Sequence, residues 1–361
     1  MKIALLNLPF DNNYGGNLQR YALIKVLQSW GQDVEHINLK FRYTLPWYKI
    51  PYSYSKRLFV KIFKDKTQLI YFEREKNKKK QFCEHNANLF YNKYIPHTDA
   101  VYTIQQIKDV IDSAHFEAII VGSDQVWRKS MTGSIGYENF FLKFVGDNIL
   151  KIAYSASLGS SHCDYTYKEI RKIKELYKRF AAVSVREKSA LDIFSNNGWI
   201  SPKAEWTLDP TLLLTIVDYN DLIMNANTEN VTREKIFCYA LDMNDKIKSE
   251  LNSYGIDYVI NDLNSSAKVS IEQWLNNIKQ SKIVLTDSYH GVVFSIIFNK
   301  PFRFMGNVRR GNDRIDSLFS MLGIDEKNTL DCDWNKINDR IAELRKKSLS
   351  FLFSGLNFKK T

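Results

Sequence analysis

The sequence predicts an α/β protein with two Rossmann-like domains that face one another across a cleft. Short apolar runs rich in β-branched residues alternate with amphipathic segments along most of the chain, which is the pattern of parallel strands connected by helices. The chain has 361 residues, too many for one compact core. We expect an N-terminal domain over 1–220, a polar linker over 218–232 and a C-terminal domain over 233–330. A helix with a basic tail over 333–361 can pack back on the N-terminal domain.

The chain opens with a β-loop-α-β unit. We predict a strand over Lys2–Asn7, a helix over Leu18–Trp30 and a second strand over Asp33–Leu39. The loop between them carries Gly15, Gly16 and Asn17. A glycine pair lets the backbone approach a ligand closely, although a structural turn explains it equally well. The loop is not GxGxxG, so dinucleotide binding is not expected.

Four further strands of the N-terminal half end in polar or charged residues. Ligands of open parallel sheets bind in the crevice at the carboxyl ends of the strands. An arginine there can offer a bidentate fork to an anion, and a carboxylate can act as a base or cap a helix. Capping is the commoner fate of such a carboxylate. The candidates at strand ends are Asp124, Ser157, Arg186 and Asp209.

The C-terminal half is organised around residues 282–304. We predict a strand over Lys282–Thr286, a turn at Asp287 and Ser288, a helix over His290–Phe298 and a strand over Phe302–Phe304. This order places His290 at a helix N-terminus, whose free N–H groups favour an anion. The sequence thus predicts a titratable imidazole in an anion-binding notch.

Residues 41–100 form a basic, aromatic-rich insertion. Many lysines alternate with aromatic and aliphatic residues over Lys56–Lys80. This segment is either a basic amphipathic helix that lies on an anionic membrane or a helical excursion packed on its own domain, and we favour the second interpretation. The net charge of +11 and the isoelectric point of about 9.2 indicate an anionic partner.

Several classes of function are excluded by the motifs. The four cysteines have no CxxC spacing, which argues against a zinc site or a disulfide framework and favours a reduced, cytoplasmic setting. No metal or other cofactor is expected, because no P-loop, HExxH or zinc motif is present. The basic segment lacks a nucleic-acid-binding module. We find neither a signal peptide nor a transmembrane stretch.

Six segments, taken in order, resemble the polysaccharide pyruvyl transferase family. They are NNYGGNLQRYAL, VGSDQVW, AYSASLG, VREKSAL, LDPTLLL and TDSYHGVVFSIIFNKPF. The resemblance extends from Lys2 to about Leu322. It implies a glycosyltransferase-B-like fold and transfer of the enolpyruvyl group of phosphoenolpyruvate, the co-substrate, to a sugar. The usual product is a pyruvate ketal in a capsule or exopolysaccharide precursor.

The resemblance also implies roles for individual residues. Arg186 and His290 match the family's donor-site arginine and histidine, and we expect both to be catalytic. The cation expected about twenty residues beyond the histidine is one of Arg309, Arg310 and Arg314. The remaining expected donor residues are Ser288, Gly291 and Lys300, and the expected acceptor residues are Gly15, Gly16, Asn17, Asp124, Ser157 and Asp209.

The implied partners are phosphoenolpyruvate and a saccharide acceptor, with a polyprenyl diphosphate as its candidate carrier. Such an acceptor is compatible with peripheral contact at the inner face of the cytoplasmic membrane. Three alternatives remain open. The first is a sugar-nucleotide-dependent glycosyltransferase of the same architecture, the second is a non-catalytic carbohydrate-binding scaffold, and the third is a relative of the family that has changed its donor. A pure binder of neutral sugar would not need the cations around His290.

Overall fold

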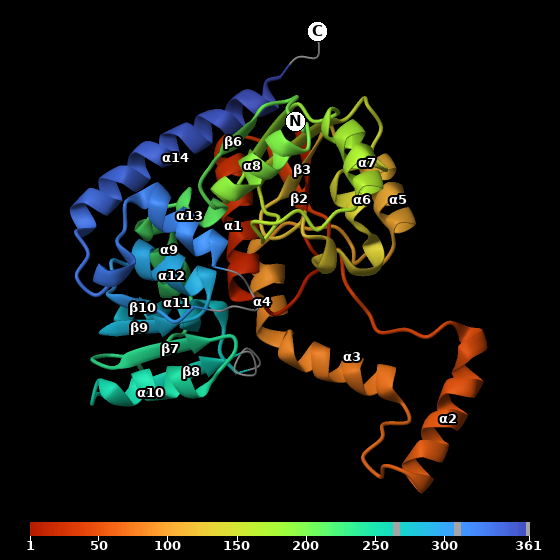
Figure 1. Cartoon of the computed structure of the whole chain (residues 1–361), viewed down its shortest axis with the longest axis horizontal. Coiled ribbons are helices and arrows are strands. Elements are labelled where there is room, and N and C mark those ends of the chain that lie inside the picture. The colour runs from red at the N-terminus through yellow and green to blue at the C-terminus, as the bar shows by residue number, and fades with distance from the viewer. Residues whose placement is uncertain (263–267, 307–311, 359–361) are drawn as a thin grey trace.

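A computed structural model describes residues 1–262, 268–306 and 312–358. It contains two parallel α/β domains, each built on one sheet (Figure 1), so the predicted fold class is confirmed. The N-terminal sheet has the order β2-β1-β3-β4-β5-β6 and the C-terminal sheet has the order β10-β9-β7-β8. The strands are β1 (Lys2–Leu6), β2 (Asp33–His36), β3 (Ala118–Gly122), β4 (Leu150–Ala156), β5 (Ala182–Val185), β6 (Ala204–Trp206), β7 (Ile236–Ala240), β8 (Tyr258–Asp262), β9 (Ile283–Thr286) and β10 (Phe302–Phe304).

Helices connect these strands in both domains. The N-terminal half contains α1 (Tyr14–Ser29), α2 (Ile50–Phe63), α3 (Phe72–Cys83), α4 (His85–Tyr94), α5 (Ile104–Ala114), α6 (Tyr137–Phe140), α7 (Tyr167–Tyr177), α8 (Lys188–Asn196) and α9 (Ile216–Met224). The C-terminal half contains α10 (Asp245–Ser253), α11 (Ile271–Gln280), α12 (Tyr289–Ile297), α13 (Asp313–Leu322) and α14 (Trp334–Leu356). Short 3-10 turns are η1 (Trp47–Lys49), η2 (Lys129–Met131), η3 (Gly133–Ile135), η4 (Pro210–Leu212) and η6 (Glu326–Asn328).

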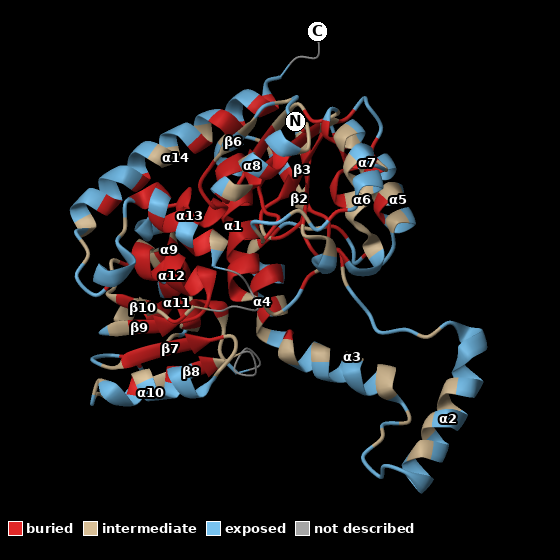
Figure 2. Cartoon of the chain, viewed as in Figure 1, coloured by how far each residue is buried: buried red, intermediate tan, exposed pale blue. Residues whose placement is uncertain are grey.

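The sheet orders put a ligand crevice between the domains. The connection from β1 leads to β2 on one side, whereas β3 lies on the other side of β1. The same reversal separates β8 from β9 around β7. Ligands bind where the strand order reverses. The strands are largely buried (Figure 2), so they form a rigid base for the loops at these two points.

Helix α1 begins four residues earlier than predicted. The side chain of Asn13 caps it by accepting a hydrogen bond from the Gly16 N–H at 3.3 Å. Gly15 and Gly16 therefore belong to the first helical turn and not to a loop. The N-cap asparagine supplies the physical reason, because it satisfies a free N–H of that turn.

The expected linker is partly helical. Helix α9 occupies its first part, and Thr215 and Asp218 form a capping box at the N-terminus of α9. Tyr219 is buried and donates a hydrogen bond to the Thr211 carbonyl at 2.7 Å. This short helix was not predicted, because the segment has a polar composition. One capping motif and one buried tyrosine stabilise it.

Helix α14 runs from the C-terminal domain back across the N-terminal domain (Figure 1). Arg345 donates to the carbonyls of Leu212 and Leu214 at 2.8 and 2.9 Å. The Ser348 hydroxyl accepts from the Leu208 N–H at 3.0 Å. These bonds fix the segment around β6 and η4, which carries Asp209.

Residues 41–83, here called the arm, project away from both domains (Figures 1 and 2). The arm contains η1, α2 and α3, and neither α2 nor α3 has a buried residue. The favoured interpretation, an excursion packed on its own domain, is therefore wrong for these helices. The charge and aromatic content of this segment set it apart in the sequence, but composition alone does not predict whether its helices pack against the rest of the domain.

Candidate active site

A cavity of about 140 Å³ lies between the carboxyl ends of the two sheets. The N-terminal domain contributes residues after β1 and β3 together with the start of α1, and the C-terminal domain contributes residues after β7, β9 and β10 together with α13. Both points of strand-order reversal thus face the same space. Its charged or titratable wall residues are Asp11, Arg20, Asp124, Asp287, Tyr289, His290 and Arg314.

The turn between β9 and α12 presents His290 to this cavity. Ser288 is the N-cap of α12, and its hydroxyl accepts from the Gly291 N–H at 3.4 Å. A Cβ atom on Gly291 would lie 2.2 Å from the Thr286 hydroxyl oxygen, so glycine allows the helix to start this close to β9. Asp287 accepts from the Leu241 N–H at 2.6 Å, which ties the turn to the end of β7. Ser288 and Gly291 therefore shape the turn that holds His290.

Gly15 provides the space that the His290 imidazole occupies. A Cβ atom on Gly15 would lie 2.0 Å from the His290 Nδ1 atom. Gly15 is also absent from the cavity wall, although Gly16 lines it. The predicted ligand-binding role of Gly15 is thus replaced by a packing role across the domain interface.

Asp209 joins the two predicted catalytic residues. Its Oδ2 atom lies 3.1 Å from Arg186 Nη1 and 3.7 Å from His290 Nε2. Burial alone would raise the pKa of Asp209, but His290, Arg186 and the Thr211 hydroxyl together hold that pKa well below its usual range. Asp209 is therefore an anion that positions Arg186 and His290, and it does not line the cavity.

Arg186 lies directly behind the cavity wall. Its guanidinium carbon is 4.7 Å from the centre of the Tyr289 ring, and Nη2 is 3.5 Å from Asp124 Oδ1. Its Nε and Nη2 atoms are buried without a hydrogen-bond partner among the described residues, as is His290 Nε2. Buried donors are normally satisfied. An anion in the cavity can contact His290, which lines it, and is attracted by the charge of Arg186 from behind Tyr289.

Arg314 supplies the downstream cation within the described residues. It lies on α13, lines the cavity and is 5.7 Å from the centre of the same Tyr289 ring. Burial and the nearby Arg186 lower the pKa of Arg314 to about 10, so it stays charged at neutral pH. The other two candidates, Arg309 and Arg310, lie outside the described residues.

Asp124 is the predicted acceptor residue that the structure places on the cavity wall together with Gly16. Its φ of +63° is uncommon for a residue other than glycine. Burial would raise the pKa of Asp124, but Arg186, Arg314 and His290 lower it. Two guanidinium groups therefore share this carboxylate.

The remaining predicted residues are not brought to the cavity. The Asn17 side chain donates to the Asn13 carbonyl at 2.9 Å, and the Ser157 hydroxyl donates to Glu187 at 3.0 Å. Both are buried structural contacts. Lys300 lies two residues before the first residue of strand β10, so it lies at the amino end of the sheet and not at the carboxyl end that faces the cleft. Its assignment to the donor site is not supported.

The sequence analysis missed three contributors to the site. Gln19 donates to Asp209 Oδ2 at 2.6 Å and to the Ser123 hydroxyl at 2.8 Å. Tyr289 lies against both guanidinium groups, and Arg20 lines the cavity. Tyr289 could have been predicted at the site, because it stands next to His290 in the sequence. Nothing in the sequence places Gln19 beside a residue 190 positions away.

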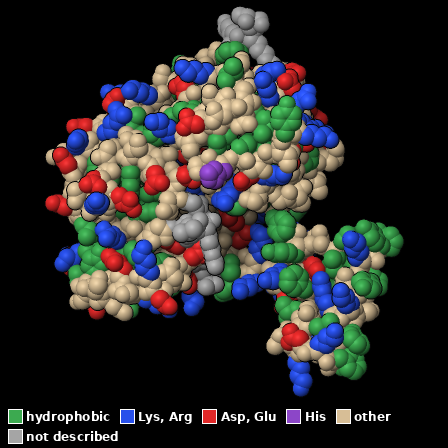
Figure 3. All heavy atoms as spheres, viewed as in Figure 1, with side chains coloured by type: hydrophobic (Ala, Val, Ile, Leu, Met, Phe, Trp, Pro, Cys, Tyr) green, Lys and Arg blue, Asp and Glu red, His purple; other side chains and the backbone are tan. Residues whose placement is uncertain are grey.

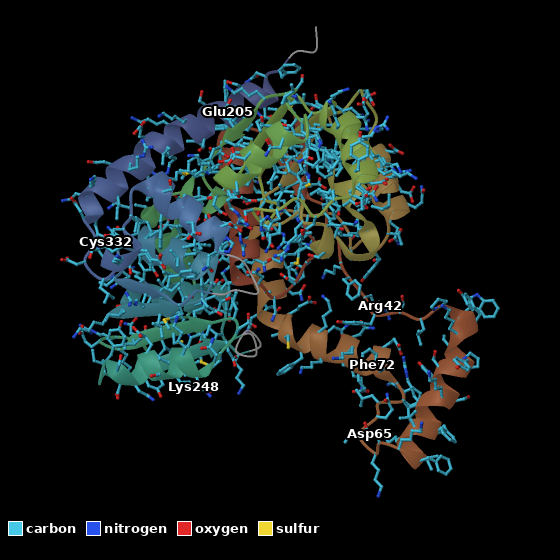
Figure 4. The ribbon with its side chains drawn as sticks, viewed as in Figure 1. Arg42, Asp65, Phe72, Glu205, Lys248 and Cys332 are labelled. Atoms are coloured by element: carbon cyan, nitrogen blue, oxygen red, sulfur yellow. The ribbon has the colours of Figure 1, made fainter. Side chains whose placement is uncertain are left out.

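A second cavity of about 580 Å³ adjoins the first. The two share four wall residues, Leu8, Pro9, Asp11 and Met131. The second cavity lies at the root of the arm, which Figure 4 marks with Arg42. Its other walls include aromatic rings and cations, namely Phe10, Lys40, Phe41, Arg42, Lys80 and Tyr102. The sequence analysis did not predict this cavity, because its walls come from separate segments of the chain.

Comparison with solved structures supports the fold. A UDP-GlcNAc 2-epimerase from Neisseria meningitidis bound to UDP-GlcNAc is similar, with a TM-score of 0.51, 9% sequence identity and coverage of 99% of each chain. The enzyme of the same name from Methanocaldococcus jannaschii, in complex with UDP-GlcNAc and UDP, gives a TM-score of 0.52 and 13% identity, with coverage of 99% of this chain and all of that chain. The likeness is to the glycosyltransferase-B-type architecture alone.

Sequence comparison identifies the family. A search of curated proteins found no match. A family model described as polysaccharide pyruvyl transferase matches residues 13–307, which include His290, Arg186, Asp209 and every wall residue of the first cavity from Asn13 to Phe304. The match covers strands β2 to β10 and most of the loops that face the cleft, whereas β1, Asp11 and Arg314 lie outside it. The chain is therefore a transferase that belongs to the polysaccharide pyruvyl transferase family.

Proposed function

We propose that this enzyme transfers the enolpyruvyl group of phosphoenolpyruvate to two hydroxyl groups of a saccharide and forms a pyruvate ketal. The observation that carries this proposal is that His290 and Arg314 line one small interdomain cavity and that Arg186 lies directly behind Tyr289 in its wall. Phosphoenolpyruvate is a small donor with a phosphate and a carboxylate, so it suits two neighbouring guanidinium groups. The first turn of α12 adds N–H groups that favour an anion.

The proposed reaction begins with protonation of the methylene carbon of the donor. The adjacent carbon becomes an oxocarbenium-like centre, and a sugar hydroxyl attacks it and loses its proton. The bond from that carbon to the phosphate oxygen then breaks, and phosphate leaves with the electron pair. A second hydroxyl attacks and closes the ketal. The two sugar hydroxyls lose one proton each. One of these protons makes up for the proton added to the methylene carbon, and the other is taken up by the released phosphate.

In this proposal His290 is the general acid and base. It is the imidazole on the cavity wall, and Asp209 lies 3.7 Å from its Nε2 atom, where the carboxylate can hold the ring in place. Arg314 holds the donor from α13, and the positive charge of Arg186 adds attraction from behind Tyr289. The leaving phosphate would thus be neutralised as its charge develops.

We place the acceptor saccharide in the second cavity. The shared walls bring its hydroxyl groups to the donor, and the aromatic rings and cations suit a sugar that carries a diphosphate. Lys40 lies over the Phe10 ring at 5.1 Å and donates to Asn88 at 3.1 Å. This assignment replaces the predicted acceptor roles of Gly15, Asn17, Ser157 and Asp209. We further propose a polyprenyl diphosphate carrier and action at the inner face of the cytoplasmic membrane.

Donor choice can be tested by product release. The purified enzyme should release phosphate from phosphoenolpyruvate when a mixture of polyprenyl-diphosphate-linked saccharides is present, and very little without it. Parallel reactions would contain UDP-GlcNAc in place of phosphoenolpyruvate. Release of UDP together with no release of phosphate would contradict the proposed donor and favour a glycosyltransferase.

Replacement of Arg42 with glutamine should raise the KM for the acceptor by about tenfold to a hundredfold, because a hydrogen bond to a charged group contributes about 1.5–3 kcal/mol. Half-saturation by phosphoenolpyruvate should stay unchanged. Arg171→Gln, an exposed arginine on α7, is the matched control. An acceptor KM unaffected by the Arg42 change, measured by steady-state kinetics, would contradict a phosphate contact there.

A further inference from the structure

The arm exposes an unusual amount of apolar surface. It holds thirteen of the twenty-eight exposed large hydrophobic side chains of the described residues, although it spans residues 41–83 alone. Trp47 is 82% exposed and Phe63 is 69% exposed. Scattered single residues of this kind are normal on a soluble protein, but a contiguous apolar patch marks an interaction site. Figure 3 shows hydrophobic and basic side chains together on the projecting arm.

One face of α2 carries four of these side chains. Tyr52, Phe59, Ile62 and Phe63 are spaced so that they lie on the same side of the helix. The rings of Phe59 and Phe63 are 4.7 Å apart. The opposite side of α2 faces α3, where Arg57 makes two hydrogen bonds to Glu73, both at 2.7 Å. The apolar face is therefore turned outward.

The arm is a defined hairpin and not an extended loop. The Arg57–Glu73 pair joins α2 to α3, and Arg57 also donates to the Ile70 carbonyl at 3.2 Å. At the root, the Tyr43 backbone and the Asn77 side chain exchange two hydrogen bonds at 3.0 and 2.8 Å. Figure 4 marks Asp65 between the two helices and Phe72 at the start of α3. This geometry holds the outward face of α2 in a fixed orientation.

The apolar face of the arm could bind a second copy of the chain or a membrane, and the charge of the arm favours a membrane. The arm has twelve Lys and Arg against three acidic residues, so it carries +9 of the net charge of +11. Two such arms would repel one another, which disfavours a second copy of the chain. An anionic bilayer complements both the aromatic residues and the cations. Within the described residues, no helix has the length and hydropathy to cross a membrane.

We propose that the arm docks this enzyme on an anionic membrane through the outward face of α2. The aromatic and aliphatic side chains enter the headgroup region, and lysines such as Lys56, Lys61 and Lys64 contact anionic headgroups. The second cavity lies at the root of the arm, so an acceptor anchored in the same bilayer would reach it. Docking does not depend on the donor chemistry, and membrane binding and transfer can therefore fail separately.

Vesicle co-sedimentation tests the proposal. The full chain should bind vesicles of phosphatidylcholine with phosphatidylglycerol and should bind pure phosphatidylcholine far more weakly. The variant Phe59→Ser, Ile62→Ser, Phe63→Ser should lower the partition coefficient by about a hundredfold or more. Its control is Ile200→Ser, Val217→Ser, Met224→Ser, which removes exposed apolar residues elsewhere and should bind like the wild type.

A second variant tests the charge contribution. Lys56→Glu, Lys61→Glu, Lys64→Glu should also weaken binding by about a hundredfold or more, whereas Lys168→Glu, Lys336→Glu, Lys346→Glu should have a much smaller effect. Because every substituted residue of the arm is exposed, the variants should remain folded. The proposal is overturned if the wild type binds neither vesicle, or if the arm variants bind as tightly as their controls. If the wild type does not bind vesicles and the variant Phe59→Ser, Ile62→Ser, Phe63→Ser changes the oligomeric state, the outward face of α2 instead binds a second copy of the chain.

Discussion

Replacement of His290 with glutamine should lower kcat by about 10²- to 10⁴-fold, which is the usual effect of removing a general acid or base. Glutamine has nearly the same volume and can keep polar contact with Asp209, so the buried site should remain packed. The loss should appear as slower phosphate release at saturating phosphoenolpyruvate. The variant should also have a kcat that depends less on pH than that of the wild type, because the group proposed to transfer the proton is gone.

Direct measurement of donor binding separates the two roles that His290 can have. A proton-transfer role predicts a large loss of kcat with a small change in the dissociation constant for phosphoenolpyruvate. A weaker donor complex with a nearly unchanged kcat would instead assign His290 to holding the phosphate. Full turnover by His290→Gln together with an unchanged dissociation constant for phosphoenolpyruvate, in a variant whose near-UV circular dichroism is like that of the wild type, would contradict both roles.

Replacement of Gly15 with alanine should lower kcat by about a hundredfold although Gly15 does not line the cavity. The new Cβ atom would lie 2.0 Å from His290 Nδ1, so the imidazole must move, and a displacement of about 1 Å can cost that much in rate. Alanine itself suits a helix better than glycine. A large loss of rate with little loss of stability would therefore report displacement of His290.

Gly16→Ala is the matched comparison, since it makes the same change one residue further along α1. Its Cβ atom would lie 3.6 Å from the nearest atom, Nη1 of Arg20, which is an ordinary van der Waals distance. Its loss of kcat should be much smaller. Equal rates for the two variants in single-turnover experiments would show that Gly15 does not position His290.

Sequence patterns located the parts of the site that lie at the ends of strands. His290 was predicted from its position in the turn after β9, and Arg186 from its position at the end of β5. Both predictions used the rule that a parallel sheet brings the carboxyl ends of its strands together at one edge. The same rule misplaces Lys300, which precedes its strand. The chain alternates strand and helix strongly enough that both sheets follow from periodicity, whereas the short helix α9 was hidden by its polar composition.

The contacts across the cleft could not be predicted in the same way. Gly15 and His290 are 275 positions apart, and the role of Gly15 exists because α1 and α12 meet at the interface. The two strand-end carboxylates Asp124 and Asp209 looked alike in sequence, yet one lines the cavity and the other is buried behind it. The direction of the arm also depends on packing, since a basic amphipathic helix can either cover its own domain or project from it.

The most direct test of the central claim is mass spectrometry of polyprenyl-diphosphate-linked saccharides after incubation with the enzyme and phosphoenolpyruvate. The account predicts that one acceptor gains the mass of pyruvic acid less one water, with one phosphate released for each acceptor converted. Fragmentation should place the added group across two hydroxyls of a single sugar. A folded enzyme that leaves every acceptor unchanged with phosphoenolpyruvate, but adds a sugar to one of them from UDP-GlcNAc, would contradict it.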